Sequence, residues 1–152
     1  MKNLEKLLDQ LESRISLFEK ENIAISKSNV GWHIEHSLLT LNGVTKVLLQ
    51  SDPKDYQWKF NFTRFLILKT GKIPRGKVKA PKVVVPQTTI DRATLLTHIK
   101  ESRNSLLELK TISKDHYFEH PFFGKIKRKD TIRFLEIHTN HHWKIMEDII
   151  KS

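Results

Sequence analysis

Apolar residues recur at the spacing of an α-helix in four stretches of the chain. Residues 3–20, 28–50, 88–112 and 129–152 place apolar side chains at every third or fourth position, with Glu, Lys and other polar residues between them. This spacing is typical of an amphipathic helix that buries one face. Ser28 is a candidate N-cap of the second helix, and the Ser-Asp-Pro sequence at 51–53 ends that helix.

The second and third stretches are joined by a long connection. Prolines interrupt residues 52–87, and within it residues 61–70 have the composition of a short apolar helix or packed segment. Some four-helix bundles use such a crossover, and a chain of 152 residues suits a single domain. The sequence therefore predicts an all-α fold, a four-helix bundle over residues 1–152 with a long crossover between helices 2 and 3.

The segment before the last helix is rich in aromatic residues. Tyr117, Phe118, Phe122 and Phe123 lie within a few positions of one another. We expect this cluster to close one end of the core, and we expect His120, which precedes a proline, to be a loop residue and not a ligand.

The candidate chemistry lies in the last predicted helix. His138 and His142 are four residues apart, which places their side chains one above the other on one helical face, about 6 Å apart. Both lie near the centre of an apolar stripe that includes Phe134 and Ile145. Neutral imidazole is a good ligand for zinc, nickel, copper or iron, and its burial without a partner costs a few kcal/mol. The pair is therefore predicted either to bind a metal ion or to form hydrogen bonds in the core.

The second predicted helix supplies two more histidines. His36 is the preferred ligand because it lies deep in the helix, beside the small residues Thr40 and Gly43. His33 lies in the first turn, where a hydrated capping role is common. His33 and His141 remain alternative ligands, or residues that support the ligands.

The composition excludes several kinds of site. The chain has no cysteine, which excludes disulfides, thiolate ligands and a cysteine nucleophile. Any metal must be held by His, Asp or Glu, and any thiol must arrive with a substrate. No apolar run approaches the roughly 18 residues that span a bilayer, and the first residues lack the apolar core of a secretory signal. We therefore expect a cytoplasmic protein with no membrane partner.

The positive charge is densest in one connection. The chain has a formal net charge of +10, and residues 69–82 carry basic residues with no acidic one among them. Lys72, Arg75, Lys77 and Lys79 are candidates for binding an anionic small molecule; a solvated loop is the alternative. Aromatic residues for base stacking are not interleaved here, so nucleic acid is not favoured as a partner.

Two segments carry a resemblance to a known family. HPFFGKIKRKDTIRFLEIHTNHHWKI at 120–145, with SNVGWHIEHSLL at 28–39 upstream, resembles the DinB-like (YfiT-like) superfamily of metal-dependent proteins. The resemblance implies a four-helix bundle and a divalent ion, zinc or nickel, in an open site formed by His36, His138 and His142. Characterised members of that superfamily include bacillithiol S-transferases and mycothiol-dependent maleylpyruvate isomerases.

Three histidines with an open coordination position are typical of a catalytic site, because structural zinc sites are usually closed by four protein ligands. The expected function is a metal-dependent enzyme acting on a small molecule, a transferase in which a low-molecular-weight thiol binds the ion and attacks an electrophile. A metal-dependent hydrolase and a non-enzymatic basic binding module with structural histidines are the alternatives.

Two further expectations concern the last helix and its surroundings. No general acid or base is identified, because Glu35 and Asn140 point away from the ligands on a helical wheel and Glu136 lies on the exposed face. Ile137 and Ile150 are apolar residues at the edge of the last helix, where they suggest a homodimer contact.

Overall fold

The computed structural model describes residues 1–76, 81–86 and 89–152. The described residues form five α-helices: α1 (Lys2–Glu12), α2 (Val30–Gln50), α3 (Phe62–Thr70), α4 (Arg92–Thr111) and α5 (Arg128–Lys151). They also form two short strands, β1 (Tyr117–His120) and β2 (Gly124–Lys127), and the 3₁₀ turns Ile15–Leu17, Pro53–Asp55 and Lys82–Val84. The chain is therefore mostly helical, as predicted.

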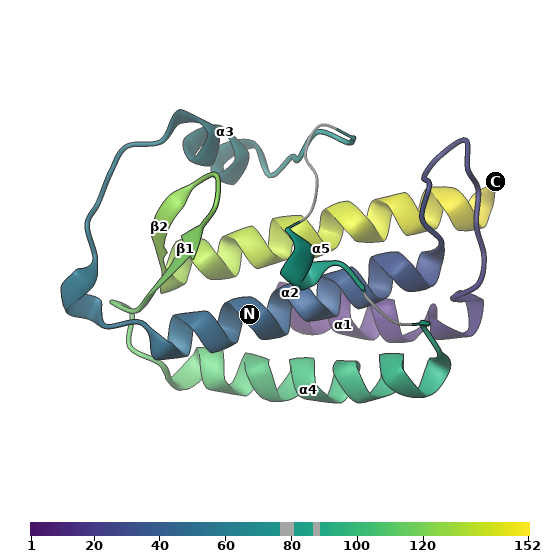
Figure 1. The fold of residues 1–152 in the computed structure, drawn as a ribbon, viewed down its shortest axis with the longest axis horizontal. Coiled ribbons are helices and arrows are strands. Elements are labelled where there is room, and N and C mark those ends of the chain that lie inside the picture. The colour runs from purple at the N-terminus through teal and green to yellow at the C-terminus, as the bar shows by residue number, and fades with distance from the viewer. Residues whose placement is uncertain (77–80, 87–88) are drawn as a thin grey trace.

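Four helices share one hydrophobic core. α1 and α2 each pack against both α4 and α5, and the long helices run side by side along the length of the molecule (Figure 1). Fully buried leucines from all four helices meet between them, among them Leu8, Leu38, Leu109 and Leu135. α3 lies outside this group in the connection between α2 and α4, and it packs against α5.

The helix boundaries differ from the predicted ones at two places. The first helix ends at Glu12, and a separate 3₁₀ turn follows at Ile15–Leu17, whereas the apolar pattern predicted a helix to residue 20. The N-cap of α2 is Asn29 and not Ser28, because the Asn29 side chain accepts the backbone N–H of Trp32 at 2.8 Å. Of the two alternatives for residues 61–70, a short apolar helix or a packed segment, the structure has the helix, α3.

A β-hairpin before α5 was not predicted. β1 and β2 pair antiparallel, with Phe118 opposite Ile126, and β2 runs directly into α5. Phe123 and Ile126 are buried in the core, whereas Phe122 is 53% exposed. The aromatic segment therefore closes one end of the core as expected, but it does so as a hairpin, and the all-α prediction is incomplete here.

His120 stabilises the hairpin turn. Its Nδ1 accepts the backbone N–H groups of Phe122 and Phe123 at 3.1 and 3.2 Å, and its ring stacks on Phe123 with ring centroids 4.0 Å apart. Because Nδ1 accepts both bonds, the proton of the neutral ring is on Nε2.

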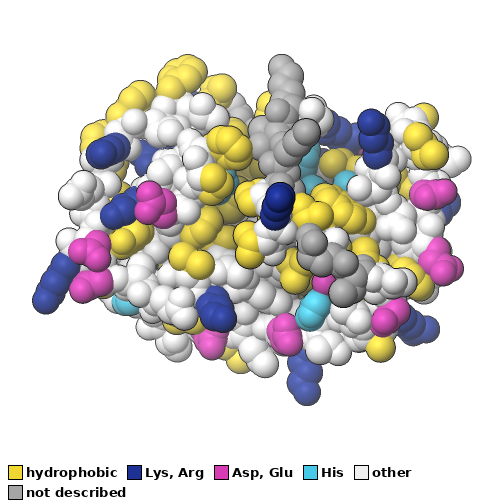
Figure 2. Space-filling view, in the orientation of Figure 1, with side chains coloured by type: hydrophobic (Ala, Val, Ile, Leu, Met, Phe, Trp, Pro, Cys, Tyr) yellow, Lys and Arg dark blue, Asp and Glu magenta, His cyan; other side chains and the backbone are white. Residues whose placement is uncertain are grey.

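Arg64 of α3 ties the crossover to the hairpin. Its buried guanidinium donates to the backbone carbonyls of Phe123 and Lys125, each at 3.2 Å, and to that of Lys59. Beside it, apolar side chains gather on the surface over α3 (Figure 2), and Trp58, Phe60 and Phe62 are each about two-thirds exposed.

Ile137 and Ile150 do not form the exposed edge that was predicted. Ile137 is 4% exposed on a helix that packs against α1, and Ile150 is partly buried against the core. Ile137 is therefore not part of an exposed surface, Ile150 is only partly exposed, and the homodimer contact stays a prediction. Within the described residues, no helix combines the length and the apolar character that crossing a membrane requires.

Candidate metal centre

A close contact between two backbone segments positions the start of α2. The N–H of Gly31, in the first turn of α2, donates to the carbonyl of Phe18 at 2.7 Å. A Cβ on Gly31 would lie 3.0 Å from that carbonyl oxygen, so glycine allows the two segments to meet. This contact fixes the start of α2, the helix that carries His33 and His36.

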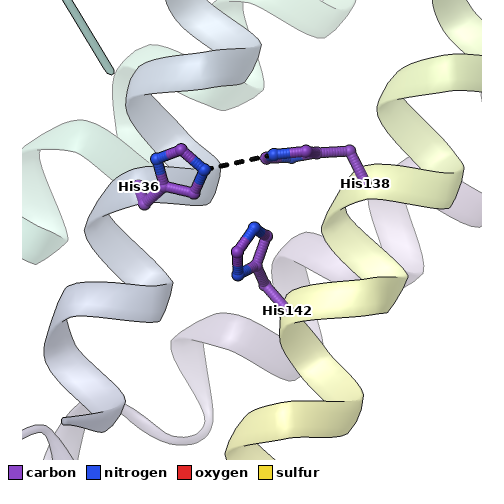
Figure 3. Close-up of side chains that lie close together, drawn as sticks. All are labelled: His36, His138 and His142. Atoms are coloured by element: carbon purple, nitrogen blue, oxygen red, sulfur yellow. Dashed lines mark hydrogen bonds between the residues drawn. The ribbon is translucent and has the colours of Figure 1, made fainter. Parts of the chain in front are cut away.

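Three histidines from two helices converge in the interior. His36 of α2 faces His138 and His142 of α5 (Figure 3), and one ring nitrogen of each lies within 4.8 Å of the others. The Nε2 atoms of His36 and His138 are 3.2 Å apart. A tetrahedral ion with bonds of about 2.0–2.1 Å holds its donor nitrogens about 3.3–3.4 Å apart. In the described part of the chain, this is the one group of His, Asp or Glu residues close enough to hold a metal ion.

The hydrogen bond at Nδ1 of His36 directs the lone pair of its Nε2 towards His138, where a metal could bind. Its Nδ1 lies 2.7 Å from the carbonyl of Val84, in the 3₁₀ turn of the crossover. A carbonyl only accepts, so the proton of His36 is on Nδ1 and the lone pair is on Nε2. Ligating histidines commonly donate their second N–H to a backbone carbonyl in this way, which fixes the ring orientation.

His138 has an unsatisfied buried nitrogen. Its Nδ1 is buried and has no hydrogen-bond partner among the described residues, and its Nε2 faces the Nε2 of His36. A neutral ring with one proton cannot satisfy both of its nitrogens in this environment. Three converging imidazoles are a donor set that fits a divalent metal ion.

Burial keeps the imidazoles neutral. Desolvation lowers the pKa of His36, and it lowers the pKa values of His138 and His142 well below 6.5, with repulsion from the neighbouring histidines adding to the effect. A neutral imidazole offers the lone pair that a metal requires. The centre therefore needs little deprotonation to accept an ion at neutral pH.

His33 also belongs to this centre, although it lies outside the group of three. Its Nδ1 lies 2.9 Å from the Nδ1 of His142, and its Nε2 lies 3.0 Å from the hydroxyl of Ser26. Desolvation, with repulsion from His36, lowers the pKa of His33 to about 4. His141 is half-buried and contacts the His142 ring edge-on, with centroids 5.1 Å apart.

Trp32 and Thr40 lie on α2 on either side of His36. The ring of Trp32 stacks on His36, with centroids 4.9 Å apart and planes 15° from parallel. Thr40, one helical turn beyond His36, is buried, and its hydroxyl has no partner among the described residues. Gly43 lies on the surface and not beside His36.

The acidic residues near the ligands in sequence have other partners. Glu35 is buried and pairs with His98 of α4 at 2.8 Å, so it points away from the three histidines as predicted. Glu136 is not on an exposed face: its side chain is 13% exposed, and it pairs with the Met1 amine and with Arg133.

The predicted anion-binding residues are only partly described. Lys72 and Arg75 are exposed, and the Arg75 guanidinium pairs with Asp148 of α5 at 2.7 Å. Lys77 and Lys79 lie outside the described residues. Elsewhere on the face in Figure 2, basic side chains are scattered among acidic ones.

Sequence reasoning missed two contacts of the centre. The Val84 carbonyl is a backbone group of a distant segment, and no sequence signal identifies it. The contact between His33 and His142 did have a signal, because an antiparallel pair of helices that joins His36 to His138 also brings position 33 to position 142.

Comparison with known proteins places the chain in a family. No curated protein and no solved structure matches it. One family model, described as "Protein of unknown function (DUF1569)", matches residues 58–149, which is more than half of the chain. The match spans α3 to α5 and includes His138 and His142, whereas His36 lies upstream of it. The chain therefore belongs to the DUF1569 family.

Proposed function

We propose that this protein is a metal-dependent enzyme whose divalent ion, zinc or nickel, is held by His36, His138 and His142. The convergence of three neutral imidazole donors within 4.8 Å carries the proposal. We further propose that the four packed helices form a bundle of the DinB-like type, with the metal site on the facing helices α2 and α5.

The protein's residues provide the binding and orientation that such a centre needs. The Val84 carbonyl orients His36, and the Trp32 ring covers one face of that imidazole. Three protein ligands leave a coordination position for substrate or water. A bound ion would lower the pKa of a coordinated thiol or water towards neutrality.

We propose a thiol transferase as the reaction class. The chain has no cysteine, so a thiol nucleophile must come from a small molecule. Lys72 and Arg75 are exposed cations of the crossover, the connection that also supplies the Val84 carbonyl to His36, and Arg75 is in addition paired with Asp148. They would attract a thiol cosubstrate that carries carboxylates or other anionic groups.

The test of the metal site is elemental analysis of protein purified without a histidine tag, next to the double variant His138→Ala, His142→Ala. We expect near-stoichiometric metal in the wild type, or after reconstitution with zinc or nickel, and none in the double variant. A His116→Ala variant is the matched control, because His116 bonds to Leu48 and Ser51 away from the site. A wild type that holds no metal after reconstitution refutes the proposal and favours a non-enzymatic role.

The test of the reaction class is a screen of the metal-loaded protein against low-molecular-weight thiols and electrophiles. We expect thiol binding and turnover that the double variant loses. Turnover of esters, amides or phosphates without any thiol would assign a hydrolase instead.

A further inference from the structure

A chain of hydrogen bonds leads from the metal centre to the loop before α2. The His142 Nδ1 lies 2.9 Å from the His33 Nδ1, the His33 Nε2 lies 3.0 Å from the Ser26 Oγ, and Ser26 accepts the backbone N–H of Ser28 at 3.1 Å. His33 is 4% exposed and His142 is 9% exposed. Water therefore has little access to the contact between the two rings.

The contact between the two Nδ1 atoms requires that exactly one of them carry a proton. Each neutral ring has one N–H and one lone pair. If the proton is on His142 Nδ1, the lone pair of His142 is on Nε2, and the His33 Nε2–H donates to Ser26. If the proton is on His33 Nδ1, then His142 carries its proton on Nε2 and Ser26 donates to His33. The two arrangements differ in what His142 presents to His36 and His138.

Only the first arrangement leaves His142 able to bind an ion through the nitrogen that points at the other two histidines. In Figure 3, one nitrogen of His142 points into the space between His36 and His138. Since Nδ1 is engaged by His33, that nitrogen is Nε2. A protonated Nε2 has no lone pair for a metal.

We infer that His33 is a positioning residue that accepts the Nδ1 proton of His142 and so directs the Nε2 lone pair of His142 to the metal site, with Ser26 as the end of the chain. The inference rests on the proposed metal site. It assigns to His33 the role that the Val84 carbonyl has for His36. The difference is that the His33 imidazole can exchange the donor and acceptor roles of its two nitrogens when Ser26 rotates its hydroxyl, whereas a carbonyl can only accept.

The test compares two substitutions of His33 that differ in one property. His33→Asn keeps an acceptor oxygen near the place of Nδ1, whereas His33→Leu fills a similar volume without an acceptor. Zinc affinity is measured by competition with a chromophoric chelator, and His116→Leu is the control for loss of a half-buried histidine away from the site. We expect His33→Leu to lose roughly 10–100-fold in affinity, with His33→Asn recovering most of that loss.

A second measurement reads the proton position directly. In zinc-loaded protein labelled with ¹⁵N, we expect His142 to be protonated on Nδ1 and to show a scalar coupling across the hydrogen bond to the Nδ1 of His33. His33→Leu would abolish that coupling. If His33 acts only through packing, His33→Leu should bind zinc at least as tightly as His33→Asn.

The outcomes separate this inference from the proposed function. Wild type and His33→Leu binding zinc equally well would overturn the role of His33 and leave the metal site standing. A His142 ring protonated on Nε2 in the zinc-loaded protein would overturn it as well. If the wild type binds neither zinc nor nickel, the proposed function fails first, and the assignment of His33 fails with it.

Discussion

Acidification is expected to destabilise the metal-free protein, and His120 provides a measurable part of the effect. Desolvation among the aromatic rings lowers the pKa of His120 from 6.5 to about 4, and its Nδ1 accepts two backbone N–H groups in the hairpin turn. Below pH 6.5 the unfolded chain takes up a proton at this histidine, whereas the folded protein does not until the pH approaches 4. The contribution is therefore present above pH 6.5 and is lost as the pH falls.

The size of the effect follows from these two values. At pH 5, the unfolded state gains about 2 kcal/mol relative to the folded state from this histidine alone. Because His120 is partly exposed, solvent makes this an upper value. The site histidines shift in the same direction, so the total loss between pH 7.5 and pH 5 is larger.

The assay is urea unfolding of chelator-treated protein at pH 7.5, 6 and 5, comparing the wild type with His120→Asn. The asparagine oxygen can accept the same backbone N–H groups but does not titrate. Between pH 7.5 and pH 5, we expect the free energy of unfolding of the wild type to fall by about 1–2 kcal/mol more than that of His120→Asn. A difference that stays constant across this range would show that His120 is not desolvated in the hairpin.

Three further substitutions test packing and polar satisfaction. Thr40→Val should raise the free energy of unfolding by about 1 kcal/mol, because it removes a buried hydroxyl without a partner among the described residues. A lower free energy of unfolding in chemical denaturation would show that the hydroxyl is satisfied. Arg64→Met should cost about 2–4 kcal/mol, because it leaves three backbone carbonyls without their buried donor, and hydrogen exchange should show the opening first in α3 and the hairpin; uniform protection would contradict the local role. Leu135→Ala should cost about 2–5 kcal/mol, because this leucine is fully buried between the helices; thermal unfolding close to that of the wild type would mean that the core refills the cavity.

Periodicity predicted the helices well because their buried faces are long. α2 and α5 each present an apolar stripe over many turns, and burial of a stripe fixes both the helix and its facing side. That is also why His36, His138 and His142 were expected to face the interior. The hairpin has no such signal, since β1 and β2 are four residues each and are held partly by Arg64, which comes from elsewhere in the chain.

Contacts between distant elements account for the other differences. Ile137 lies at the edge of its helical stripe, so its burial depends on where α1 packs, which a helical wheel of α5 alone does not contain. Glu136 likewise meets the Met1 amine, 135 positions away. The extent of the first helix was overestimated because the apolar spacing continues through the 3₁₀ turn at Ile15–Leu17.

The charge of the three histidines limits which metal ion and which fourth ligand suit the proposed site. His36, His138 and His142 are neutral ligands, and Glu35, the acidic residue nearest to them in sequence, is turned to His98. A divalent ion held by these three would keep its full charge in a chain whose formal net charge is already +10. Such a site disfavours magnesium and calcium, which prefer oxygen ligands. It favours an anionic fourth ligand, and a thiolate from a small molecule or a hydroxide from water meets that requirement. Among the described residues, the group that could hold the ion contains no carboxylate, and this feature links the proposed metal to the proposed class of substrate.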